Sequence, residues 1–181
     1  MFVYRARKLW QSVESRIRQT MFRIAGMHIA GKVWMGRIEW PNRPYCVSLG
    51  KGAMLDHGIT LLATSDRARI VIGAGVYINR HTILDVDELL ELGDETMVGP
   101  GCYLTDHDHT FGLDTLPGAT PLVAAPTRIG KRCWLGANVT VLKGITIGDG
   151  TVVGAGSVVT KSLPPGVLAL GTPARIIREL T

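Results

Sequence analysis

The sequence predicts an all-β solenoid, and three features of its 181 residues carry that prediction. Aliphatic residues recur every six positions, glycine follows many of them, and aromatic residues make up only 6% of the chain. A period of six fits neither an α-helix nor a hairpin, but it fits a coil with flat sides of about six residues, each pointing one aliphatic side chain inward. The registered positions are Ile72, Ile78, Leu84, Leu92, Val98, Leu104, Ile129, Leu135, Val141, Ile147, Val153 and Val159.

Residues 1–24 form a separate element in the pattern. Apolar residues there recur at spacings of three and four, which predicts an amphipathic helix. Six basic residues and one acidic residue in positions 1–23 give a surplus of five positive charges, equal to the net charge of the whole chain. The apolar stripe is expected to dock on the body of the protein or on a sister subunit, or to contact an anionic membrane surface. The absence of interleaved aromatics argues against nucleic acid.

Length and composition narrow the class of protein. A chain of 181 residues is expected to form one domain with an appendage. No apolar run reaches the roughly 18 residues of a membrane span, and the N-terminus lacks the apolar core of a secretion signal, so we expect a cytoplasmic protein. Cys46, Cys102 and Cys133 are far apart in the sequence, which predicts buried, reduced thiols rather than disulfides or a cysteine zinc site.

The six-residue register breaks twice. The step from Leu84 to Leu92 is two residues too long, and the step from Leu104 to Ile129 is 25 residues. Residues from 106 to about 126 must therefore leave the coil as a projecting loop, which is either functional or disordered. That loop begins in the stretch YLTDHDHTFGLD, whose histidines and acids permit three interpretations: a metal site, a proton-transferring base, or a solvated loop.

The tandem pattern I-G-x-x-small-x over residues 70–177 resembles the hexapeptide repeats of left-handed parallel β-helix acyltransferases. The C-terminal half is similar to the maltose and galactoside O-acetyltransferase group and to polysaccharide-biosynthesis acetyltransferases. The resemblance implies a left-handed β-helix over 25–172, where Leu49, Leu55 and Leu61 are fainter repeats of irregular opening coils. It also implies a homotrimer with active sites between subunits and acetyl-CoA as the co-substrate. Residues 173–181 are expected to leave the coil as a short C-terminal helix.

The resemblance gives the catalytic position to His109, and His107 is a departure from the family's pattern. His107, Asp106 and Asp108 are candidate supporting residues, since a neighbouring carboxylate can fix the tautomer of the imidazole. The chemistry agrees, because imidazole is a free base near neutral pH and can take a proton from an attacking hydroxyl. The alternatives are a metal bound by the two histidines with Asp106, Asp108 or the distant His81, and acids that only cap the loop.

Substrate contacts are also implied by the resemblance. On the acceptor side they are Asn79 and the acids Asp85 and Asp87, with a left-handed corner conformation for the asparagine and solvated surface acids as alternatives. On the donor side, an aromatic, a backbone N–H and terminal cations would hold acetyl-CoA, with plain packing and surface charge as alternatives. The donor-side positions are Trp134, Gly136, Ala137, Ala155, Thr160, Lys161, Arg175 and Arg178.

The expected function is therefore acetyl-CoA-dependent O-acetylation of a sugar hydroxyl, in surface polysaccharide synthesis. Direct transfer with no metal is expected, because the chain lacks an activated Ser or Cys motif. The alternatives are acetylation of another alcohol, such as serine or an antibiotic, a zinc-dependent enzyme like the β-helix carbonic anhydrases, and a non-catalytic scaffold.

Overall fold

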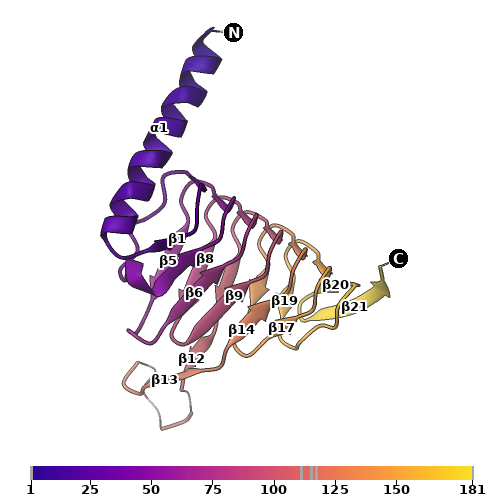
Figure 1. The fold of residues 1–181 in the computed structure, drawn as a ribbon. Helices are drawn as coiled ribbons and strands as arrows, with labels where there is room; N and C mark the ends of the chain where they lie inside the picture. Colours follow the sequence, from indigo (N-terminus) through magenta and orange to yellow (C-terminus); the bar gives the residue numbers. More distant parts are fainter. Residues whose placement is uncertain (1, 111, 115, 117, 181) are drawn as a thin grey trace.

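The computed structural model describes residues 2–110, 112–114, 116 and 118–180, and within residues 2–11 the backbone alone. Short parallel strands wind into a three-sided coil, preceded by one long helix (Figure 1). Side A carries β1 (His28–Ile29), β3 (Val47–Leu49), β6 (Arg69–Ile72), β9 (Leu89–Leu92), β14 (Thr127–Ile129) and β17 (Thr146–Ile147).

The other two sides have the same construction. Side B carries β2 (Trp34–Met35), β4 (Met54–Leu55), β7 (Tyr77–Ile78), β10 (Met97–Val98), β15 (Trp134–Leu135), β18 (Val152–Val153), β20 (Val167–Gly171) and β21 (Ala174–Glu179). Side C carries β5 (Thr60–Ala63), β8 (Ile83–Val86), β11 (Tyr103–Thr105), β16 (Thr140–Val141) and β19 (Val158–Val159). Apart from β21, each of these strands pairs in parallel with the equivalent strand of the coil before it, after it or both, so the all-β solenoid prediction is confirmed.

The interior follows the six-residue period. All twelve registered aliphatic side chains are buried, and so are the small or β-branched residues four positions after them. The polar side chains among these small residues bind backbone groups of the next coil. The hydroxyl of Thr96 donates to the carbonyl oxygen of Gly130 at 2.7 Å, and the thiol of Cys102 lies 3.2 Å from the carbonyl oxygen of Gly136. The three cysteines are free and buried, and burial raises the pKa of the Cys102 and Cys133 thiols.

The opening coil is irregular, as expected from its faint repeats. It contributes β1 and β2, and a 3₁₀ helix, η1 (Pro44–Cys46), then leads into the next coil. Asn42 replaces the missing strand of side C: its side-chain amide donates to the carbonyl oxygen of Ala63 at 2.8 Å and accepts from the N–H of the same residue at 3.0 Å. One side chain thereby completes the backbone pairing of the first strand on that side.

The helix α1 (Phe2–Ile24) lies against β1 and β2 only at its C-terminal end and extends away from the coils (Figure 1). Its buried face contains Ser15, Gln19 and Phe22. Four residues of the predicted apolar stripe, Val13, Ile17, Met21 and Ile24, are exposed on the other face, so docking of this part of the stripe on the chain's own solenoid was a wrong alternative. Among the described residues, no helix is long and apolar enough to cross a membrane.

The C-terminal segment corrects another expectation, because Ala174–Glu179 is a strand and not a helix. It turns back after Pro173 and pairs antiparallel with β20, with Gly171 opposite Ala174 and Val167 opposite Glu179. The last parallel strand leaves an open edge of N–H and C=O groups, and the chain end satisfies them. Pairing with this edge stabilises the strand more than the helical spacing of apolar residues in ARIIREL would stabilise a helix.

Candidate functional site

The two register breaks meet in space. The carboxylate of Asp106 is fully buried and accepts three backbone N–H groups from the extended corner that follows β8. The distances are 2.8 Å from the N–H of Asp87, 2.7 Å from Glu88 and 2.6 Å from Leu89. The first break thus forms a cradle for the residue at which the second break begins.

His107 lies directly beside this cradle, and its side chain is only 9% exposed. Its Nδ1 atom is 3.0 Å from Oδ1 of Asp106 and 3.3 Å from the hydroxyl oxygen of Thr105. An ionised carboxylate is an acceptor only, so Nδ1 carries the proton and donates it to Asp106. In the neutral imidazole the lone pair then lies on Nε2, which is 3.8 Å from Oδ1 of Asp85.

Asp85 faces the imidazole from β8. Its Oδ2 atom accepts a hydrogen bond from the Tyr103 hydroxyl at 3.0 Å. Its Oδ1 atom is buried and has no hydrogen-bond partner among the described residues. Burial, followed by the charge of Asp85, raises the pKa of Tyr103, so the tyrosine stays a neutral donor. An unsatisfied buried carboxylate oxygen calls for an additional donor, such as a water molecule or a substrate hydroxyl.

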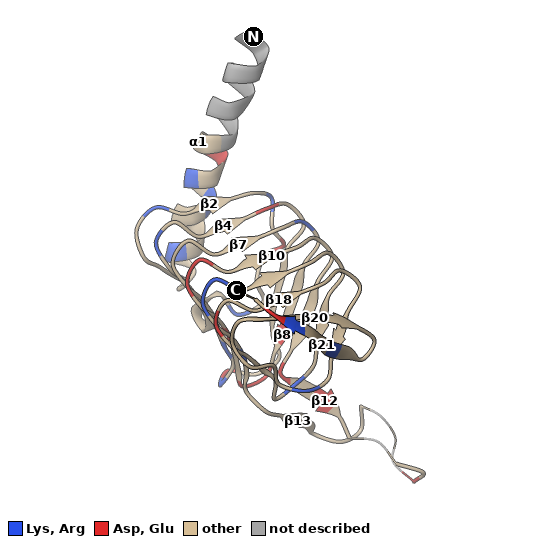
Figure 2. Cartoon of the chain, turned by 90° about the vertical axis from the view of Figure 1, so that its right-hand side faces the viewer, with Lys and Arg blue, Asp and Glu red and all other residues tan. Residues whose placement is uncertain are grey.

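The segment after Asp106 leaves the coil as a hairpin, in which β12 (His107–His109) pairs antiparallel with β13 (Leu122–Ala124) (Figures 1 and 2). His109 is exposed on this hairpin, and within the described part of the chain its side chain makes no hydrogen bond or ion pair. Asp108 forms an ion pair with Lys143 at 3.1 Å, which holds the hairpin against the following coil. Only the first histidine therefore has partners that orient its ring.

The expected acceptor residues separate into different environments. Asp85 belongs to the histidine cluster, whereas the carboxylate of Asp87 is occupied by the guanidinium of Arg67 and by the Thr64 hydroxyl at 2.8 Å. Burial alone would raise the pKa of Asp87, but hydrogen bonds from Arg67 and Thr64 outweigh burial and hold the pKa below its ordinary value of 3.8. Asp87 is neither a solvated surface acid nor a free acceptor.

Asn79 ends β7 at a corner of the coil. Its side-chain oxygen accepts the N–H of Arg80 at 2.8 Å, and its own backbone is not left-handed, so the left-handed alternative for this residue was wrong. The left-handed corner residue nearby is His81, with φ 57°. No hydrogen bond or ion pair joins Asn79 to the histidine cluster among the described residues.

On the expected donor side, Trp134 is 55% exposed on the outer face of side B. It belongs to a row of outward apolar side chains, one per coil, which we call the side B row. Arg178 continues the row on β21, three strand spacings of roughly 4.8 Å beyond the tryptophan. The apolar members of the side B row are Trp34, Met54, Tyr77, Met97, Trp134, Val152 and Leu168.

Backbone donors are available at the corner beside Trp134. At the equivalent corners of two earlier coils, a side chain caps the next N–H: Asp56 accepts from His57 and Asn79 accepts from Arg80, each at 2.8 Å. In the last coils glycine precedes Ala137 and Ala155, and neither N–H has a partner among the described residues. The N–H of Gly136 is not available to a ligand, because it donates to the carbonyl oxygen of Val153 at 2.8 Å.

The remaining donor-side candidates are exposed cations and a hydroxyl. Thr160 and Lys161 follow β19 on side C, whereas Arg175 lies with Arg178 on β21. The two groups thus leave from different sides of the coil, and only the β21 pair lies in the sheet that carries Trp134.

Three side chains that contact the candidate site residues were not identified from the sequence. They are Tyr103, which binds Asp85, Arg67, which binds Asp87, and Lys143, which binds Asp108. Three sides of six residues give coils of about 18 residues, and Tyr103 bonds an acid 18 positions earlier, while Arg67 bonds one 20 positions later. Counting one coil along the chain would have found both. Lys143 contacts Asp108 across the hairpin insertion, where such a count fails.

No group of three or more His, Cys, Asp and Glu side chains is arranged to hold a metal ion in the described part of the chain. His81 belongs to another corner, at which its ring lies beside Gly58. The ligand set considered from the sequence, the two loop histidines with His81, is therefore not brought together.

Comparisons with known proteins agree with the solenoid fold. A family model for the hexapeptide repeat of succinyl-transferase matches residues 126–161. The putative colanic acid biosynthesis acetyltransferase WcaF of Escherichia coli is 33% identical over 183 residues, covering 95% of this chain and 86% of the relative. The chain belongs to the hexapeptide-repeat acyltransferase family. Galactoside O-acetyltransferase of Escherichia coli is 35% identical over 62% of the chain, and the chain spans 55% of the length of that relative.

Solved structures share the fold of this hexapeptide-repeat chain. The N-acyltransferase AntD of Bacillus cereus, in complex with dTDP and 3-hydroxybutyryl-CoA, superimposes with a TM-score of 0.79 at 24% identity, covering 90% of this chain and 88% of AntD. The hexapeptide-repeat acetyltransferase VCA0836 of Vibrio cholerae gives a TM-score of 0.63 at 26% identity, covering 92% of this chain and 81% of that one. These likenesses establish the left-handed β-helix acyltransferase fold.

Proposed function

We propose that this protein is an acetyl-CoA-dependent O-acetyltransferase that acts on a sugar hydroxyl in surface polysaccharide synthesis. The observation that carries the proposal is the cluster of His107, Asp106 and Asp85, in which one imidazole nitrogen is free beside an unsatisfied carboxylate oxygen. Names of relatives supply the substrate class, since WcaF and the putative lipopolysaccharide biosynthesis O-acetyl transferase WbbJ of Escherichia coli both point to polysaccharides.

We assign the role of general base to His107, although the resemblance in the sequence pointed to His109. A base needs one nitrogen held in a fixed tautomer and the other directed at the substrate, and Asp106 meets the first need for His107. His109 has no such partner among the described residues. Nε2 of His107 and Oδ1 of Asp85 lie 3.8 Å apart, so two neighbouring hydroxyls of one sugar can reach them together, each donating its proton to one of the two atoms.

The reaction then follows from these contacts. As the acceptor oxygen bonds to the thioester carbonyl carbon, its proton passes to Nε2 of His107, and the imidazolium is stabilised by Asp106 and Asp85. When the carbon–sulfur bond breaks, the same nitrogen returns the proton to the departing sulfur. The unpaired N–H of Ala137 is our candidate donor to the carbonyl oxygen during this step, and Trp134 our candidate contact for the donor's flexible arm.

We further propose a cytoplasmic homotrimer, in which the neighbouring subunit completes the donor groove. The exposed apolar side B row supports this proposal, since an uncovered line of tryptophan and methionine side chains favours association or ligand contact. Light scattering that finds an active monomer would overturn the trimer without touching the assignment of the reaction.

The test of the reaction is release of free CoA from acetyl-CoA in the presence of a panel of sugars, nucleotide sugars, an amino sugar and serine. Mass spectrometry of the product, with the site of acetylation located by NMR, should find an ester on a sugar hydroxyl. Acetylation of serine alone or of an amine alone would overturn the assignment, as would stoichiometric zinc that activity requires. Absence of transfer to every acceptor while acetyl-CoA still binds would favour the scaffold alternative.

A further inference from the structure

Over residues 12–24, where its side chains are described, the helix α1 presents an apolar face that no described residue of the solenoid covers. Val13, Ile17, Met21 and Ile24 recur at spacings of four, four and three, and all four side chains are exposed. In the sequence the same stripe continues toward the N-terminus through Val3, Ala6 and Trp10. Apolar stripes on helices of soluble proteins usually face the core, so an outward stripe needs another apolar environment.

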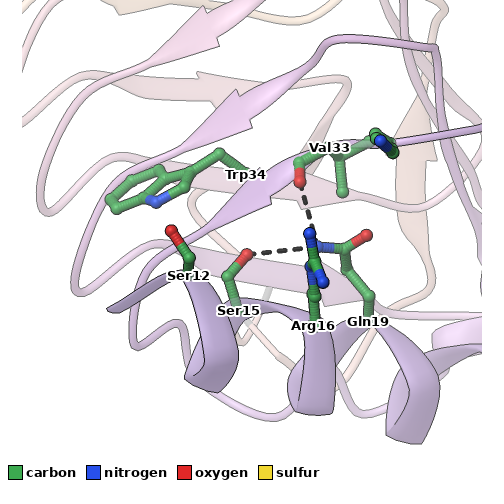
Figure 3. A pocket seen from close by; sticks show the side chains of 7 residues that line it. Ser12, Ser15, Arg16, Gln19, Val33 and Trp34 are labelled. Carbon is green, nitrogen blue, oxygen red and sulfur yellow. Dashed lines mark hydrogen bonds between the residues drawn. The ribbon is translucent and has the colours of Figure 1, made fainter. Parts of the chain in front are cut away.

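Hydrogen bonds at the root of α1 fix which face points outward. The side-chain amide of Gln19 donates to the carbonyl oxygen of Val33 at 2.9 Å and to the hydroxyl oxygen of Ser15 at 3.1 Å (Figure 3). The same hydroxyl oxygen accepts the N–H of Met35 at 2.9 Å. Because these buried polar contacts require this face of the helix, α1 cannot rotate its apolar stripe onto the coils without losing them.

Charge distinguishes the possible occupants of the apolar face. Within residues 12–24, whose side chains are described, α1 carries Arg16, Arg18 and Arg23 against the single acid Glu14 (Figure 2). Arg18 and Arg23 also reach back to the coil: Arg23 donates to the carbonyl oxygen of Gly31 at 2.8 Å. Arg16 is exposed and, with Lys32, lines a cavity of about 180 Å³ between the helix and the first coil (Figure 3). Cations therefore flank the stripe where it meets the solenoid.

We propose that α1 is a peripheral anchor that lies in the surface of an anionic membrane, with its apolar face among the acyl chains and its arginines at the headgroups. A helix whose outward face is apolar and flanked by arginines fits the lipid–water boundary. A second copy of the helix is the competing occupant, but it would bring two surpluses of five positive charges together. Anionic headgroups neutralise the same charges.

The experiment measures co-sedimentation of the full chain with vesicles of phosphatidylcholine alone and of phosphatidylcholine with phosphatidylglycerol. We expect binding to be at least tenfold stronger on the anionic vesicles. The double variant Ile17→Gln, Met21→Gln should lose at least tenfold of that binding, because two apolar side chains no longer enter the lipid. Arg16→Gln should weaken binding about fivefold, and on anionic vesicles only.

Ile177→Gln is the matched control, since Ile177 is 56% exposed and Ile17 is 54% exposed, but Ile177 lies on β21 far along the coil. It should bind vesicles like the wild type, and every variant should keep the wild-type melting temperature. Absence of binding to anionic vesicles, or equal loss in the Ile177 variant, would overturn the proposal. So would a drop in oligomer mass caused by the double variant, which would identify a second copy as the occupant. None of these readouts depends on the proposed enzymatic activity.

Discussion

The Oδ1 atom of Asp106 lies 3.0 Å from the Nδ1 atom of His107, while the same carboxylate accepts three N–H groups from the preceding coil. The consecutive residues Asp106 and His107 thereby have different structural roles. The carboxylate anchors the chain where it leaves the solenoid, and the imidazole is oriented by that anchor. This relationship makes the hairpin a rigidly attached element at its base, and it leads to the predictions below.

The first prediction separates the two histidines. His107→Ala should lower kcat at least about a hundredfold while acetyl-CoA binding survives, since a positioned general base contributes roughly two to four powers of ten. His109→Ala should cost less than about fivefold, because His109 is exposed and lacks an orienting partner. Steady-state kinetics together with calorimetric acetyl-CoA binding would measure both. A large loss for His109→Ala alone would restore the residue favoured by the resemblance.

The second prediction concerns stability. Asp106→Asn should lower the free energy of unfolding by about 2–4 kcal/mol, because a neutral amide presents one acceptor oxygen where the carboxylate serves three N–H groups, and its NH₂ group meets other donors. Denaturant titration measures the change. Asp108→Asn is the matched control: its ion pair with Lys143 is partly exposed, so the loss should stay below about 1 kcal/mol. Equal losses would mean that the cradle contributes little.

The repeat pattern predicted most of the fold, because each registered aliphatic reports one inward position and needs no information about the rest of the chain. Ile72 and Val153 are buried for the same local reason. The same local reasoning gave a wrong prediction for the C-terminal segment, which is a strand and not a helix. Its strand depends on an open sheet edge that exists only after the coils have stacked, whereas its sequence after Pro173 has the spacing of a short helix.

The sequence predicted where the candidate site lies but not which contacts its residues make. Both register breaks indicated irregular backbone with chemistry, and Asp85, Asp106 and His107 are indeed brought together there. The choice between the histidines depends on burial and on a carboxylate's remaining acceptor capacity, which no spacing reports. The sequence also did not show that the carboxylate of Asp87 is occupied, because its partner Arg67 lies one coil away.

The third prediction uses the two acids of the first register break. Asp85→Asn should raise the acceptor KM or lower kcat by about tenfold or more, since its Oδ1 atom is our candidate contact for a hydroxyl of the acceptor next to the one that reacts. Asp87→Asn should leave the acceptor KM within about twofold, because its carboxylate already serves Arg67 and Thr64. Kinetics with a saturating donor measure both. The reverse order of effects would contradict this division of roles.

The fourth prediction concerns the acid dependence of stability. The pKa of Asp87 is lower in the folded state than its ordinary 3.8, so ionised Asp87 stabilises the fold above that pH, and the stabilisation is lost as the pH falls through the folded pKa. Asp87→Asn should therefore cost about 1 kcal/mol at pH 7, and the difference from wild type should shrink below pH 4. Melting curves at several pH values test this. Glu91→Gln, on an exposed pair with Arg128, is the control and should leave the melting curve at pH 7 close to that of the wild type.

The last prediction concerns the donor. If acetyl-CoA lies along side B, Trp134→Ala should raise its dissociation constant about tenfold while the fold is kept, because an indole that is 55% exposed contributes contact area to a ligand but little to the core. Met54→Ala provides the control, since Met54 stands in the same outward row and is 42% exposed, but it lies three coils nearer the N-terminus. Calorimetry with acetyl-CoA measures both variants. Unchanged affinity in Trp134→Ala would move the donor to another side of the coil, whereas equal weakening in both variants would indicate that the whole row is buried between subunits and that donor binding depends on that assembly.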